Sequence, residues 1–82
     1  MSVADEIRAY AVKNYIEPAR TANVPQVTFT AADIHRALSL RKRYPNVCDA
    51  IGAKIFCQQN GLTVITREGP KHASTVRWTF LV

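Results

Sequence analysis

The sequence contains few of the residues that form disulfides or bind metals. Only two cysteines and two histidines occur among its 82 residues. Cys48 and Cys57 fall within one predicted helix on opposite faces, roughly 13 Å apart along its axis, so they cannot bond to each other there. His35 and His72 belong to separate predicted elements. We therefore expect no disulfide, no metal site and no cofactor.

Long apolar runs and recognisable catalytic motifs are also missing. The stretch "MSVADEIRAY" carries acids where an export signal would carry an apolar run, which predicts a cytoplasmic protein without a membrane partner. There is no P-loop, Gly-rich dinucleotide turn or paired-carboxylate pattern, and His35 has no Ser, Cys or second His at a catalytic spacing. We expect no catalytic residues, and the chain is not predicted to be an enzyme.

Acidic residues are scarce relative to basic ones. Eleven Lys and Arg against six Asp and Glu give a formal charge of +5, and the isoelectric point is near 9.7. The hydrophobic content of 48% suits a single folded domain over residues 1–82. This imbalance favours an acidic partner, although small basic domains also gain solubility from such charge.

The first residues have the pattern of an amphipathic helix. In "SVADEIRAYAVKNYI", Ser2 is a candidate cap with Asp5 three residues later. The apolar residues at helical spacing are Val3, Ile7, Tyr10 and Ala11. Pro18 lacks a backbone donor and disfavours helical geometry at Glu17, so we expect the helix to end or bend there.

A short strand is predicted to lead into a second helix. "QVTFT" is rich in β-branched residues and follows Pro25, and the pattern T-x-x-D formed by Thr30 and Asp33 is typical of a helix start. The expected buried stripe of this second helix consists of Ile34, Ala37 and Leu38.

A third helix is predicted over residues 45–60, between Pro45 and Gly61. Its expected core stripe is Val47, Ile51 and Ile55, and its opposite face carries Asn46, Asp49, Ala50, Ala53, Cys57 and Asn60, with Lys54 toward one edge. Gly52 lowers helix stability by about 0.8 to 1 kcal/mol relative to Ala, and a close helix crossing explains it best.

The C-terminal residues change to a strand pattern. "LTVIT" and "STVRWTFLV" are rich in Thr, Val, Ile and aromatic residues, and apolar side chains alternate with others in the second of these. They are joined by "REGPKHA", in which Gly69 and Pro70 are turn formers.

This order of elements resembles the winged-helix domain, a variant of the helix-turn-helix. The resemblance implies an α+β fold with three helices and a small three-stranded antiparallel sheet. It also implies that helix 45–60 enters the major groove of double-stranded DNA and that the loop 67–74 is a wing that touches phosphates or the minor groove. The chain would then act in transcription regulation or as the DNA-reading part of a larger assembly. The connection "SLRKRYP" is longer than the usual tight turn.

The basic stretch "RKRYPNV" is the strongest candidate for phosphate contact. Arg41, Lys42 and Arg43 stand beside the predicted start of a helix, where backbone amides already attract anions. The alternative is that three cations keep an exposed turn soluble. Tyr44 could stack or donate to a phosphate, or it could pack as a hydrophobic staple.

The remaining candidates lie on the third helix and in the wing. Asn46 and Asp49 are of types that hydrogen-bond to base edges. The full predicted nucleic-acid-binding set is Arg41, Lys42, Arg43, Tyr44, Asn46, Asp49, Lys54, Arg67, Lys71 and His72. The alternative function is a protein-interaction module, in which the small-residue face of the third helix or a free sheet edge binds another protein or a second copy of the chain.

Overall fold

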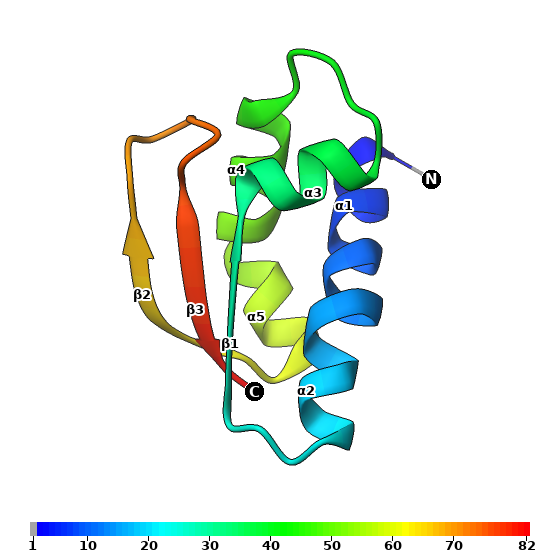
Figure 1. Ribbon diagram of the computed structural model, residues 1–82, viewed down its shortest axis with the longest axis vertical. Helices are drawn as coiled ribbons and strands as arrows, with labels where there is room; N and C mark the ends of the chain where they lie inside the picture. Colours follow the sequence, from blue (N-terminus) through cyan, green and yellow to red (C-terminus); the bar gives the residue numbers. More distant parts are fainter. Residues whose placement is uncertain (1) are drawn as a thin grey trace.

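The computed structural model describes residues 2–82, which form an α+β domain with its helices on one side of a three-stranded antiparallel sheet (Figure 1). This confirms the expected fold class at that level. The elements are α1 (Val3–Ala11), η1 (Val12–Ile16), α2 (Glu17–Thr21), β1 (Gln26–Thr30), α3 (Ala31–Ala37), α4 (Tyr44–Gly52), α5 (Lys54–Asn60), β2 (Thr63–Glu68) and β3 (Arg77–Leu81).

The first helix passes through Pro18, so of the two outcomes expected there, an end or a bend, the end does not occur. It begins at Ser2, whose Oγ accepts a hydrogen bond from the Asp5 amide at 3.1 Å. The elements α1, η1 and α2 follow one another without a gap, and η1 is a π-helical turn. A proline inside an α-helix removes a hydrogen bond and clashes with the carbonyl four residues earlier, here that of Asn14. The wider turn before Pro18 gives this carbonyl room.

The predicted start of α3 is confirmed as a capping box. Thr30 Oγ1 accepts from the Asp33 amide at 3.1 Å, and Asp33 Oδ2 accepts from the Thr30 amide at 3.0 Å. Ile34 is buried as expected, but Ala37 is exposed because α3 ends there and the chain turns away. Ala31 and His35 are the other buried residues of α3.

The prediction of one continuous helix over residues 45–60 is wrong. Ala53 adopts an extended conformation, with φ −72° and ψ 140°, and separates α4 from α5. This break changes the register, so that Phe56 is fully buried while Ile55 is 43% exposed. Burying the larger aromatic ring removes more apolar surface from water, which accounts for the change in register. Ala50, expected on the outer face, is also buried.

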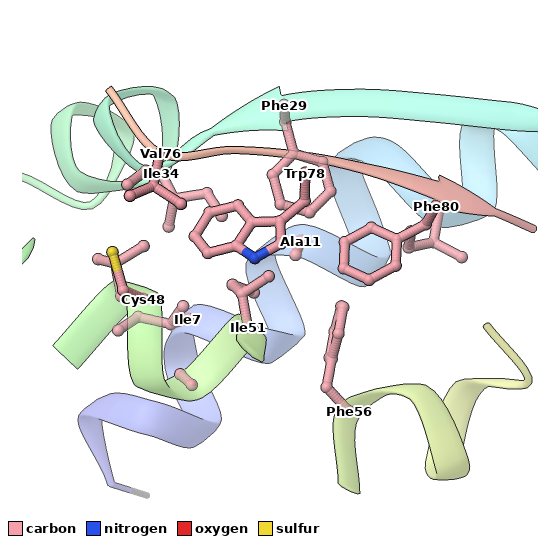
Figure 2. Close-up of a cluster of buried hydrophobic side chains, with 14 of the residues drawn as sticks. Ile7, Ala11, Phe29, Ile34, Cys48, Ile51, Phe56, Val76, Trp78 and Phe80 are labelled. Carbon is pink, nitrogen blue, oxygen red and sulfur yellow. The ribbon is translucent and has the colours of Figure 1, made fainter. Parts of the chain in front are cut away.

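The sheet has the order β1-β3-β2, so β3 pairs with both neighbours. Trp78 and Phe80 of β3 are buried beneath the helices together with Phe29 of β1 (Figure 2). The Phe80 ring lies 5.7 Å from that of Phe29 and 5.6 Å from that of Phe56. This aromatic cluster joins the sheet to α5.

The strand β2 contributes little to this core. All six of its residues are exposed, and its pairing with β3 is shifted by an irregularity between Val64 and Thr66. It forms one edge of the sheet, and the connection of residues 69–76 continues from it at the upper end of the view in Figure 1.

Candidate nucleic-acid interface

A groove of about 430 Å³ lies between α4 and the β2–β3 hairpin. Its lining residues are Cys48, Asp49, Gly52, Ala53, Arg67, Lys71 and His72. Four of them belong to the set predicted from the sequence, since Asp49 comes from α4 and Arg67, Lys71 and His72 come from the hairpin. The fold therefore brings the two predicted regions together on one concave surface.

Arg67 organises the hairpin connection. Its guanidinium donates hydrogen bonds to the carbonyls of Gly69 at 3.0 Å, Pro70 at 3.2 Å and Lys71 at 2.7 Å. Gly69 has φ +102°, a conformation that L side chains rarely adopt. Because its acceptors are neutral carbonyls, Arg67 keeps its positive charge beside the groove while it shapes the backbone of the turn.

His72 and Asp49 contact each other across the groove. The imidazole Nε2 donates to the carboxylate Oδ1 of Asp49 at 2.9 Å. The sequence predicted both residues as separate contacts to nucleic acid, whereas the structure joins the hairpin to α4 through them. No local pattern connects two positions so far apart in the chain, so sequence reasoning missed this pair.

Cys48, Gly52 and Ala53 are the uncharged residues that line the groove, and there is free space beside Gly52. A methyl group added to Gly52 would meet nothing within 4 Å, so the close helix crossing expected at this glycine is absent from the described structure. Cys48 is only 5% exposed, and its thiol lies 3.8 Å from the Ala73 carbonyl. Burial raises the pKa of the Cys48 thiol, with the Arg67 charge opposing this change and the Asp49 charge adding to it.

The basic connection between α3 and α4 is exposed but anchored through its backbone. Arg41, Lys42 and Arg43 are all exposed. The Arg43 amide donates to Nε2 of His35 at 3.2 Å, and the Leu40 amide donates to the His35 carbonyl at 3.0 Å. His35 thus holds the backbone of the connection, and the three cationic side chains are left accessible to solvent.

Tyr44 is part of this anchor. Its ring stacks on the His35 imidazole, with ring centroids 4.0 Å apart and planes inclined by 15°. The side chain is half-buried, so the packing interpretation fits Tyr44 better than that of a free stacking platform.

The predicted contacts do not form one continuous helix face. Asn46 is exposed in the first turn of α4, but Lys54 is the first residue of α5, beyond the extended Ala53, and it does not line the groove. The connection 41–43, the first turn of α4 and the hairpin tip all lie at the same end of the molecule (Figure 1). That end is therefore the candidate interface.

The groove does not resemble a metal centre. Within residues 2–82, no group of three or more His, Cys, Asp or Glu side chains is arranged to hold a metal ion. Over the same residues, none of the helices has both the length and the apolar character needed to cross a bilayer.

Comparisons of the chain with protein families, with curated proteins and with solved structures found no match.

Proposed function

We propose that the chain is a winged-helix domain that binds double-stranded DNA. In this proposal the exposed face of α4 lies in the major groove, the connection 41–43 contacts phosphates at its N-terminal end, and the β2–β3 hairpin is the wing. The observation that carries the proposal is that the basic connection and the cationic hairpin lie at one end of the molecule, on either side of the start of α4.

The topology supports the winged-helix assignment. The sheet order β1-β3-β2, with β1 entering before α3 and the hairpin following α5, agrees with the resemblance seen in the sequence. The break at Ala53 shortens the helix available for the major groove to α4, so Lys54 is left out of the proposed base-reading face.

The distribution of charge supports a polyanionic ligand. Arg41, Lys42 and Arg43 are exposed at the proposed interface, and Lys71 joins them from the hairpin. Some cations elsewhere have structural partners: Arg77 pairs with Glu68 at 2.9 Å, and Arg8 Nε donates to the Ala50 carbonyl at 2.9 Å. The charge at the interface remains available to phosphates, and Coulomb attraction there increases the rate of encounter.

A titration with random-sequence duplexes at several salt concentrations tests this function. If four or five of these cations neutralise phosphates, the slope of log K against log salt should be roughly −4. Fluorescence anisotropy of a labelled duplex measures the affinity directly. No binding at low salt, or a flat slope, would reject duplex binding.

A protein-interaction domain is the second candidate, and one observation favours it. The edge strand β2 exposes apolar side chains, with Val64 48% exposed, and edge strands readily pair with another strand. Analytical ultracentrifugation of the parent and of Val64→Lys separates the candidates, since an edge-to-edge dimer of this chain would dissociate in the variant. A chain that is monomeric at high concentration and binds duplexes supports the first proposal.

A further inference from the structure

The hairpin tip is held against α4 by a hydrogen bond between an imidazole and a carboxylate. His72, in the connection after β2, donates to Asp49 on α4 at 2.9 Å, and both residues line the groove. The tip itself is shaped by Arg67, which binds three successive carbonyls. The connection of residues 69–76 is therefore fixed internally by Arg67 and fixed to α4 by the His72–Asp49 pair.

We propose that Asp49 is a positioning residue of the interface, which acts through His72 to hold Lys71 and the hairpin tip over α4. This inference rests on the proposed duplex binding. It gives Asp49 a role different from the base contact predicted from the sequence, because its carboxylate is already engaged by the imidazole.

Electrostatics explains why an acid is tolerated at this place. An unpaired carboxylate on a surface that meets phosphates would lower the affinity through like-charge repulsion. In this structure the carboxylate instead accepts a hydrogen bond from the His72 imidazole, and Arg67 and Lys71 line the same groove.

The expected size of the effect follows from exposure. The Asp49 side chain is 71% exposed and that of His72 is 34% exposed, so this is a surface pair. Such pairs change an equilibrium by no more than about fivefold. A difference of about two- to fivefold in affinity is therefore expected, and a double-mutant cycle can resolve it.

The binding arm of the test compares the parent, Asp49→Ala, His72→Ala and the double variant on one random duplex. If Asp49 acts only through its charge, Asp49→Ala tightens binding by the same factor with or without His72. If it acts through His72, Asp49→Ala tightens binding in the His72→Ala background, but in the parent this gain is reduced or reversed. A coupling of about two- to fivefold supports the proposal, and additive effects overturn it.

The second arm follows the picosecond-to-nanosecond backbone mobility of Gly69 and of residues 71–73 in the free chain, by ¹⁵N heteronuclear NOE. Asp49→Ala and His72→Ala should each raise the mobility of the tip, and the double variant should raise it no further. The exchanged pair, Asp49→His with His72→Asp, should restore the mobility of the parent and should bring affinity closer to that of the parent than either single variant. Lys71→Ala is the matched control, because it lies on the same tip outside the pair and should leave mobility unchanged.

The two arms separate the possible failures. Unchanged mobility in both single variants overturns the positioning contact, whatever the binding result. Higher mobility without any duplex binding overturns the proposed function, and with it the role assigned to Asp49, while leaving the tip contact intact. Higher mobility with additive effects on affinity means that the contact orders the tip without positioning it for DNA, which also overturns the proposal.

Discussion

Gly52 and Gly69 differ in what an added methyl group would meet. At Gly69, with φ +102°, a Cβ would lie 3.1 Å from Val76 Cα and 3.2 Å from the Thr75 carbonyl oxygen. We expect Gly69→Ala to lower the free energy of unfolding by about 1 to 3 kcal/mol, because the residue is strained and its neighbours are backbone atoms.

Gly52→Ala is the matched variant, since its methyl group would enter free space at the end of α4. It should leave stability unchanged or raise it by up to about 1 kcal/mol. Urea unfolding monitored by Trp78 fluorescence measures both. Equal losses at the two positions would contradict the described geometry of the hairpin.

The two cysteines should react with alkylating reagents at different rates. Burial raises the pKa of both thiols, so both are poor nucleophiles at neutral pH. Cys48 is buried and Cys57 is only half-buried, so Cys57 should be labelled first and Cys48 only on unfolding. Mass spectrometry after timed iodoacetamide treatment, with the urea-unfolded chain as reference, checks the order. Labelling of Cys48 as fast as that of Cys57 in the native chain would argue against the position of α4.

At the scale of elements, the break at Ala53 decides which side chain holds α5 to the sheet. Phe56→Ala should cost about 3 to 5 kcal/mol of unfolding free energy, because it removes a fully buried ring. Ile55→Ala should cost less than about 1 kcal/mol, because that side chain is 43% exposed. Chemical denaturation of both variants provides the comparison. A loss for Ile55→Ala as large as that for Phe56→Ala would contradict the described burial of the two side chains.

The sequence predicts elements well where the signal is local. The capping box of Thr30 and Asp33 and the alternation of Trp78 and Phe80 with outward residues both depend on neighbours within a few positions. The break at Ala53 has no such signal, because alanine favours helix. The extended residue occurs where Phe56 packs against Phe80, a contact between distant parts of the chain. Tertiary packing overrode local propensity there.

The candidate site was predictable as a set of residues but not as an arrangement. Charge and turn composition pointed to the connection 41–43 and to Lys71. The contact between His72 and Asp49 and the bonds of Arg67 to the hairpin carbonyls depend on how the hairpin lies over α4. These contacts depend on the tertiary structure, and no residue spacing in the sequence predicts them.

For the molecule as a whole, the proposed interface predicts which cations contribute to DNA affinity and to its salt dependence. Changing Arg41, Lys42 and Arg43 together to Gln should reduce the steepness of the salt dependence by about three units and weaken binding to all sequences about equally. The melting temperature should barely change, because the three side chains are exposed. Anisotropy titrations in a salt series, together with thermal melts, provide both measurements.

Two single substitutions that remove the same charge at different places show whether the salt dependence of DNA binding depends on position or only on net charge. Arg41→Gln and Lys13→Gln each lower the charge by one, but Lys13 lies on η1, away from the proposed interface (Figure 1). Only Arg41→Gln should alter the salt slope, by about one unit. Equal changes would mean that net charge alone draws the chain to DNA.

The π-turn before Pro18 has a consequence for the length of the chain. Ile7, Ala11 and Ile16 are all fully buried, although the last interval is one residue longer than an α-helical turn allows. The π-helical turn accommodates this additional residue. The segment from α1 to α2 therefore corresponds to a regular α-helix with one inserted residue. Removing the exposed Lys13 together with Pro18→Ala should therefore restore α-helical spacing among the three buried side chains and yield a folded chain of comparable stability. Removing Lys13 alone also takes away the room for the Asn14 carbonyl before Pro18, and should lower the free energy of unfolding by about 3 kcal/mol. Circular dichroism and urea unfolding would reveal the result, and a one-residue deletion at Ile34 in α3, where no wide turn exists to be closed, should unfold the protein.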